Sequence, residues 1–200
     1  AFTGDGSLVA SELAHSRLMR RAARRTHLPA RRARGYFLAN GSLLYLDGAH
    51  LELATAEAAS PDELVMQIKA GDRLIDELAQ EVGQQADIQR LLVSRINVHY
   101  WPPATWACHE SISHRVDDQN ALARMLIPML ATRHIVTGAG GFDVRPAAGI
   151  KFLTSPRVCF LETPRSPHST QQRGIFHDKP ESIGNRNLRR LHLLSECSLY

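Results

Sequence analysis

Long apolar runs, paired cysteines and a leader-like N-terminus are all missing from this sequence, and each absence excludes a class of protein. A membrane-spanning helix needs about 20 consecutive apolar residues, and no such run is present. The first residues, AFTGDGSLVASEL, lack a basic stretch followed by an apolar one, so we expect no secretory signal. The 3 cysteines form no C-x-x-C pair, which favours reduced thiols in a cytoplasm over a disulfide framework.

Positive charge is concentrated in one segment. Residues 20–34 hold 7 of the 24 basic residues and no acid, so the rest of the chain is net acidic although the whole carries +4. The segment is either a solvated helix and linker or a patch that recognises anions, such as nucleic acid or an acidic protein tail. It has no aromatic residues to stack on bases, so nucleic acid is an unlikely partner.

The pattern of apolar residues, prolines and glycines predicts an α+β fold with a mainly antiparallel sheet, because strands and helices mix without a regular βαβ alternation. Predicted helices span residues 7–26, 61–82 and 117–135, and a hairpin closed by Asn40-Gly41 joins residues 36–39 to 42–47. The remaining predicted segments are a continuation of the second strand at 51–55, a buried strand at 91–98, a loop at 100–107, a second hairpin at 150–161, a polar loop at 164–180 and a turn or short helix at 182–190.

The most informative motif is Asp47, His50 and Glu52, at the end of a predicted strand. Magnesium prefers carboxylate oxygens, and a second carboxylate beside the ion can act as base or nucleophile. In one continuous strand, Asp47 would project from the opposite face to His50 and Glu52. The chain must therefore bulge or turn at residues 48–49 if all three converge. The alternative is a strand end that enters a loop with ordinary polar residues.

Three further motifs are weaker when each is taken alone. The stretch HESISH, from His109, is not the zinc-protease pattern, because its histidines are five residues apart. The glycines at 138–141 follow a helix, which indicates a helix stop and not a phosphate-binding loop. Arg190 and His192 lie in an Arg-Arg-Leu-His run that suits either a phosphate clamp or a basic helix end.

Four blocks of the sequence, read in order, resemble the Pup ligase and depupylase family, a branch of the glutamine-synthetase-like carboxylate–amine ligases. NGSLLYLDGAHLELATAE resembles the family's NGARLYxDxxHPEYxTPE segment, and RINVHYWPPATWACHESI resembles KNNTD followed by SYGCHENYL. LIPMLATRHIVTGAGG resembles PFLVTRQxVxGAGxV, and NLRRLHLL resembles YRRLHVI.

This resemblance implies a cytoplasmic enzyme that depends on ATP and Mg²⁺. It implies a glutamine-synthetase-like domain, with a curved sheet backed by helices, of which residues 36–200 form part after a basic helical arm and linker at residues 1–35. In the family, the ligase activates the C-terminal glutamate of Pup, a small disordered tag, as a γ-glutamyl phosphate and joins it to a lysine. The depupylase hydrolyses that isopeptide bond and deamidates a C-terminal glutamine. The implied partners are therefore a Pup-like acidic tag and tagged proteins.

The resemblance also assigns expected roles to individual residues. Asp47 becomes the catalytic aspartate, Glu52 and His50 the metal ligands, and His109, Arg190 and His192 the nucleotide-binding residues. Arg31, Arg32 and Arg34 of the arm are expected to bind an acidic peptide.

Spacing and departures refine the expectation. The five-residue gap from Asp47 to Glu52 matches the depupylase pattern, which favours hydrolysis over ligation. The family's first strand, with its metal-binding ETEYG motif, and a large C-terminal part are missing from this sequence. We therefore expect a fragment or a divergent member of the family. The alternative is an inactive relative that binds an acidic peptide through its arginine-rich arm.

Overall fold

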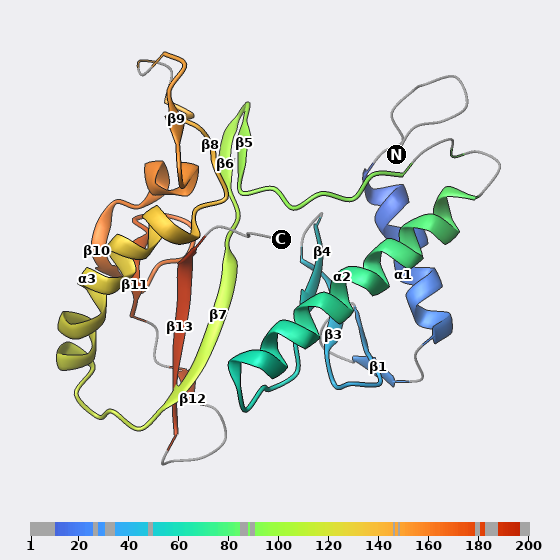
Figure 1. Ribbon diagram of the computed structural model, residues 1–200, viewed down its shortest axis with the longest axis horizontal. Helices are drawn as coiled ribbons and strands as arrows, with labels where there is room; N and C mark the ends of the chain where they lie inside the picture. Colours follow the sequence, from blue (N-terminus) through green and yellow to red (C-terminus); the bar gives the residue numbers. More distant parts are fainter. Residues whose placement is uncertain are drawn as a thin grey trace. The chain divides into compact units, whose positions relative to one another are not determined.

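The computed structural model describes residues 11–25, 28–30, 35–47, 50–84, 88, 91–145, 147, 149–178, 181–182 and 188–196. The chain divides into two compact units, residues 1–94 and residues 95–200, and each unit is described by itself. Helices and mainly antiparallel strand pairs occur in both units (Figure 1), which confirms the predicted α+β class. The predicted division into a basic arm at residues 1–35 and part of a catalytic domain at residues 36–200 stays a prediction.

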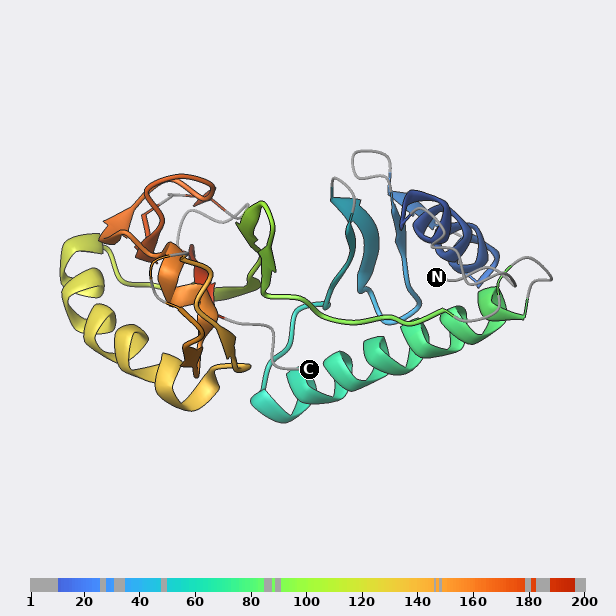
Figure 2. The ribbon, with the colours of Figure 1, turned by 90° about the horizontal axis from the view of Figure 1, so that it is seen from above.

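The first unit is an antiparallel sheet with two helices packed against one face (Figure 2). Its strands lie in the order β1–β2–β3–β4. Leu44 of the sheet is fully buried and packs with Leu18 and Leu78 from the two helices. The elements are α1 (Ser11–Arg25), β1 (Leu28–Ala30), β2 (Gly35–Phe37), β3 (Leu43–Asp47), β4 (His50–Ala54) and α2 (Pro61–Gly83).

Local signals in the sequence fix the ends of these elements. Gly41 has a φ of 84°, which a glycine adopts without strain, and the Leu38 amide donates to the Ser42 carbonyl at 2.7 Å. The Asn40-Gly41 turn is therefore confirmed. Ser60 caps α2, because its hydroxyl accepts a hydrogen bond of 3.2 Å from the Glu63 amide. The predicted start of this helix is also confirmed.

The second unit combines small antiparallel pairs, one parallel pair and a single long helix in its described part. Strands pair in the order β12–β13–β7, and β5–β6, β8–β9 and β10–β11 form separate pairs, of which only β10–β11 is parallel. The elements are β5 (Val98–Tyr100), β6 (Pro103–Thr105), β7 (Cys108–His114), α3 (Gln119–Thr137), β8 (Gly141–Phe142), β9 (Phe152–Leu153), the 3₁₀ helix η2 (Pro156–Phe160), β10 (Thr163–Ser166), β11 (Gly174–His177), β12 (Glu181–Ser182) and β13 (Arg189–Glu196).

Helix α3 supplies the core of the second unit. Its buried Leu122 and Leu130 pack with Phe176 of β11 and with Leu191 and Leu193 of β13. The Asp118 carboxylate caps the helix by accepting hydrogen bonds from two backbone amides. The helix ends at Thr137, which confirms the stop predicted at the glycines of residues 138–141. No helix in the described ranges has the length and hydropathy that crossing a membrane requires.

Several sequence predictions were wrong in the first half of the chain. Residues 51–55 were expected to continue the second strand after a bend. They do form a strand, β4, but it turns back and pairs antiparallel with β3. Residues 91–96 are irregular, with Leu92, Val93 and Ile96 all at least half exposed, and the next strand begins only at Val98. The boundary between the two compact units falls inside this apolar run. Leu91 packs against the core of the first unit, whereas Leu92, Val93 and Ile96 stay exposed.

Other predictions were wrong in the second half. The expected hairpin at 150–161 is absent from the described residues there, because β9 pairs with β8 and Pro156 opens a 3₁₀ turn. Strand β11 and most of β10 fall within the loop expected at 164–180. The loop expected at 100–107 includes β6 and the turn of the short β5–β6 hairpin, whose first strand begins at Val98. Residues 182–190 hold strand ends where they are described, and the intervening 183–187 lie outside the described residues.

Candidate functional site

The β3–β4 hairpin places the three predicted catalytic and metal-binding residues on one face of the first sheet. Asp47 lies directly opposite His50, and Tyr45 lies directly opposite Glu52. Directly opposed residues of an antiparallel pair project from the same face, so all four share it, while Leu44 projects into the core. Asp47 shares this face with His50 and Glu52 because the chain reverses between β3 and β4, so alternation along a single strand does not apply.

Tyr45 fixes the position of Glu52. Its hydroxyl donates a hydrogen bond of 2.5 Å to Glu52 Oε2. The pKa of Tyr45 is raised, first by burial and then by the hydrogen bond and charge of Glu52, with a smaller effect of Asp47. The hydroxyl therefore keeps its proton and remains a donor to the carboxylate at neutral pH.

Helix α1 adds a second imidazole close to this hairpin. The pKa of His15 is lowered, first by burial and then by the positive charge of His50. The hairpin face itself combines two carboxylates, a phenol and one imidazole, and His15 of α1 is near enough to His50 for an electrostatic effect.

The donor atoms of this face suit a magnesium ion that is shared with a phosphate ligand. In the described part of the chain, no three histidine, cysteine, aspartate or glutamate side chains gather closely enough to hold a metal by themselves. Magnesium usually keeps several waters and takes one or two carboxylates together with substrate phosphates. Glu52 offers one such carboxylate, with His50 on the same surface, so the residues present fit an ion that takes its remaining ligands from water and phosphate.

The second unit brings the predicted nucleotide-binding histidines together. His109 of β7 and His192 of β13 are in edge-to-face contact, with ring centroids 5.3 Å apart. His177 of β11 makes a similar contact with His192 at 5.7 Å. Edge-to-face packing of this kind is a favourable arrangement of aromatic rings. His177 is buried and His192 is partly buried, and the ring of His192 contacts histidines of both β7 and β11.

Arg190 lies on the same face of the β7–β13 pair as these histidines. It precedes His192 by two residues on β13, and its Nε donates to Ser111 Oγ at 3.0 Å. Ser111 lies directly opposite His192 in the register. The opposite face of β13 carries Leu191 and Leu193 into the core under α3. The sheet therefore separates an apolar face from a face with imidazoles, hydroxyls and a guanidinium.

His177 is the residue in this cluster to which the sequence analysis gave no role. It lies in the segment that was predicted as a loop, although the run Gly174-Ile-Phe-His was a short apolar signal for a strand. The next residue, Asp178, accepts a hydrogen bond of 2.8 Å from Arg165 Nε of β10. That ion pair fixes the end of β11 and with it the position of His177. The predicted peptide-binding residues Arg31, Arg32 and Arg34 lie outside the described residues.

Both units are α+β, and the β1–β2–β3–β4 sheet and the β12–β13–β7 sheet each have one apolar face and one face with titratable groups. A profile of the Pup-ligase protein family matches residues 8–197. The chain therefore belongs to the Pup-ligase family, as the sequence resemblance predicted.

Named relatives include both types of enzyme in this family. A Pup–protein ligase of Brachybacterium faecium is 38% identical over 179 residues, which cover 82% of this chain and 38% of that protein. A Pup–protein ligase of Sanguibacter keddieii is 33% identical over 172 residues, with 82% and 37% covered. A Pup deamidase/depupylase of Mycobacterium tuberculosis is 31% identical over 178 residues, with 84% and 35% covered. The chain thus spans little more than a third of each of these proteins.

A solved structure also matches. The structure of the Pup ligase PafA in complex with ADP has a TM-score of 0.67 to this chain at 26% identity. The match covers 95% of this chain and 42% of that one. The solved protein is a ligase bound to a nucleotide, and similarity in both sequence and fold now connects this chain to it.

Proposed function

We propose that this chain carries part of the active site of an ATP- and Mg²⁺-dependent enzyme that acts on a Pup-like acidic protein tag. The observation that carries the proposal is the β3–β4 hairpin face, where Asp47 opposes His50 and Tyr45 holds Glu52. Membership of the Pup-ligase family supports it, as does the ADP bound to the solved Pup ligase PafA. In this proposal both sheets are parts of one glutamine-synthetase-like fold, and the cytoplasmic location stays a prediction.

Each site residue has a proposed role. Asp47 is exposed at the end of β3 and accepts a proton from a lysine amine or from water. Glu52 and His50 hold Mg²⁺, which neutralises phosphate charge when it is bound. His109, His192 and Arg190 bind the nucleotide. The guanidinium of Arg190 binds phosphate oxygens, and the two imidazoles lie on the same face of the sheet.

Hydrolysis is favoured over ligation in this proposal. Asp47 and Glu52 are five residues apart in the sequence, and the sequence resemblance associates that spacing with depupylase and deamidase activity. The expected reaction is therefore attack of water on the isopeptide bond of a tagged protein, or on the side-chain amide of a tag that ends in glutamine. The relatives named above are enzymes, which gives the alternative of an inactive peptide-binding relative no support.

Calorimetry and a turnover assay on this chain test the proposal. We expect ATP binding that requires Mg²⁺ and that is lost in Glu52→Ala. Asp47→Asn should keep nucleotide binding but lower release of the tag from a fluorescent conjugate by about 10²–10⁴-fold, the usual loss on removal of a general base. Asp62→Asn, at an exposed aspartate of α2, is the matched control. Ligation of a tag that ends in glutamate, without any release, would reverse the proposed direction, and no nucleotide binding in the unmodified chain would overturn the proposal.

A further inference from the structure

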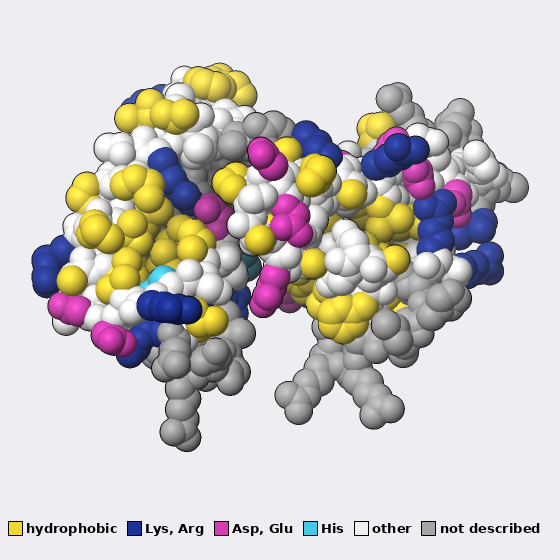
Figure 3. Space-filling model, turned by 60° about the horizontal axis from the view of Figure 1, so that its bottom comes forward, with side chains coloured by type: hydrophobic (Ala, Val, Ile, Leu, Met, Phe, Trp, Pro, Cys, Tyr) yellow, Lys and Arg dark blue, Asp and Glu magenta, His cyan; other side chains and the backbone are white. Residues whose placement is uncertain are grey.

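Helix α1 carries a row of arginines on the side away from its core contacts. Its apolar side buries Leu18 and Ala22 against the sheet and α2. Four arginines at helical spacings of three and four residues line a shallow hollow beside it, Arg17, Arg20, Arg21 and Arg24. In the view of Figure 3, lysine and arginine side chains of the first unit gather on the side that holds α1.

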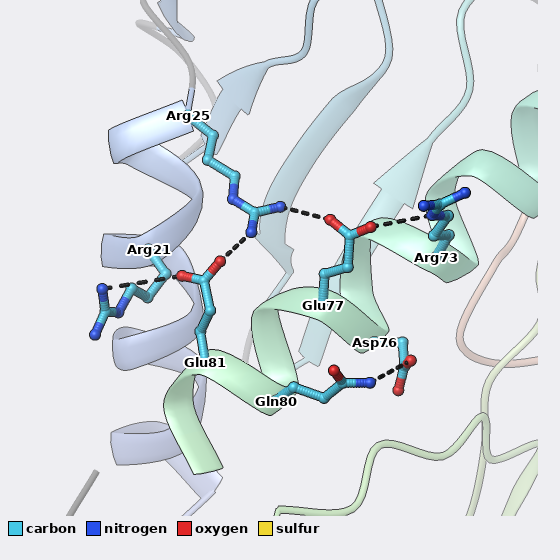
Figure 4. Close-up of polar contacts among 7 residues, drawn as sticks. All are labelled: Arg21, Arg25, Arg73, Asp76, Glu77, Gln80 and Glu81. Atoms are coloured by element: carbon cyan, nitrogen blue, oxygen red, sulfur yellow. Dashed lines mark hydrogen bonds and ion pairs between the residues drawn. The ribbon is translucent and has the colours of Figure 1, made fainter. Parts of the chain in front are cut away.

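The structure itself shows how α1 recognises an acidic helix. Arg25 donates to Glu77 of α2 at 2.9 Å and also to Glu81, and Arg21 lies 3.9 Å from the same Glu81 (Figure 4). The two glutamates are four residues apart, so they project from one face of α2. The pKa of Glu77 is lowered by its hydrogen bonds from Arg25 and Arg73, which shows that these contacts favour the charged carboxylate.

The outer part of the arginine row repeats this arrangement without the acidic helix. Arg20 and Arg24 are both exposed and are also four residues apart. Within the described ranges, no carboxylate forms an ion pair with either of them. Like charges at this spacing destabilise a helix, so Arg20 and Arg24 lower the stability of α1 until an anion neutralises them.

The shape and chemistry of this row favour one kind of anion. Guanidinium groups bind carboxylates in a bidentate manner, and two of them one helical turn apart match carboxylates one turn apart. Among the described residues the hollow is lined by arginines, with no aromatic side chain on which a nucleotide base could stack. A helix that presents acids at i and i+4 therefore fits better than a nucleic acid.

We propose that Arg20 and Arg24 form a docking surface for an acidic α-helical segment of a partner protein. The partner helix lies against α1 as α2 does, with glutamate or aspartate side chains at i and i+4 paired with the two arginines. The surface does not include Asp47, Glu52 or the histidine cluster, so the inference goes beyond the proposed reaction and stands or falls separately from it.

A charge-swap experiment tests this inference. The probe is a fluorescein-labelled helical peptide of three turns with glutamates at i and i+4, and its partner probe has the same composition with the glutamates distributed around the helix. Fluorescence anisotropy measures the Kd of each at low and at physiological salt. We expect the first peptide to bind more tightly and the double variant Arg20→Glu/Arg24→Glu to weaken it by roughly tenfold or more, because rim charges control such association.

Three controls decide the outcome. Arg115→Glu changes an exposed arginine in the second unit and should leave the affinity unchanged. A peptide with lysines in place of the glutamates should bind the double variant better than it binds the unmodified chain. Far-UV circular dichroism should show the same helix content in all the proteins. Equal affinity for both acidic peptides, equal loss in Arg115→Glu, or tighter binding of a duplex DNA of matched charge would overturn the proposal.

Discussion

The hydroxyl of Tyr45 and the carboxylate of Glu52 face each other across β3 and β4, joined by a hydrogen bond of 2.5 Å. Glu52 is the proposed metal ligand, and Tyr45 is the group that orients it. Residues that orient a ligand typically change metal affinity by about 10–100-fold when they are replaced. We therefore expect Tyr45→Phe to weaken Mg²⁺-dependent ATP binding by about that factor in calorimetry. The matched change Tyr36→Phe, on neighbouring β2, should have no such effect, and equal losses in both variants would contradict the role of Tyr45.

The raised pKa of Tyr45 makes a separate prediction about stability at alkaline pH. A group whose pKa is higher in the folded state stabilises the fold below its unfolded pKa, and this contribution is lost as the pH rises. The unfolded value for tyrosine is 10.0, so the free energy of unfolding should begin to fall above about pH 10. Tyr45→Phe should flatten this decline in urea unfolding followed by circular dichroism between pH 8 and about pH 11. An unchanged alkaline decline in the variant would show that other groups cause it.

The sequence predicted the chemistry of the hairpin better than its geometry. Asp47, His50 and Glu52 stood out because carboxylates and an imidazole are unusual at the end of an apolar strand. Strand alternation along a single strand could not bring them together, and the reversal that does so depends on pairing between β3 and β4. Helix starts at Ser60 and Asp118 were predictable because capping depends on adjacent residues alone.

The histidine cluster shows why other parts were not predictable. His109, His177 and His192 come from three strands that are far apart in the sequence, and β11 carries only four residues. A strand that short gives almost no periodic signal, so its position depends on packing against α3 and β13. The family resemblance identified two of these histidines by motif, and only the fold added the third.

The ion pairs between α1 and α2 predict a dependence of stability on acid pH. Glu77 has a lowered pKa in the folded state, first because of Arg25 and then because of Arg73. Such a group stabilises the fold above its unfolded pKa of 4.5, and the contribution is lost as the pH falls through the folded pKa. Glu77→Gln should therefore lower the midpoint of urea unfolding at pH 7 and have little effect at pH 3. An equal loss at both pH values would mean that packing, and not charge, accounts for the effect.

The core of the first unit depends on Leu44, which is fully buried between the sheet and both helices. Leu44→Ala should lower the free energy of unfolding by about 2–5 kcal/mol, because it leaves a cavity that the neighbours fill only in part. Leu43→Ala changes the neighbouring, partly exposed residue and should cost less. Urea unfolding followed by far-UV circular dichroism measures both. Similar losses for the two variants would contradict the assignment of the core face.

Gly138 ends α3 at a place where no side chain fits. A Cβ on this residue would lie 2.1 Å from the Thr154 carbonyl oxygen and 2.8 Å from that of His134. Backbone atoms cannot move aside as the end of a flexible side chain does, so Gly138→Ala should destabilise the second unit by about 1–3 kcal/mol, as overpacking generally does. Trp101 and Trp106 both lie in this unit, so tryptophan fluorescence during urea unfolding reports on it. Gly149→Ala is the matched control, because its positive φ strains a side chain while no atom lies within 4 Å of the added carbon. If Gly138→Ala cost no more than Gly149→Ala, the close approach of Thr154 would have no energetic consequence.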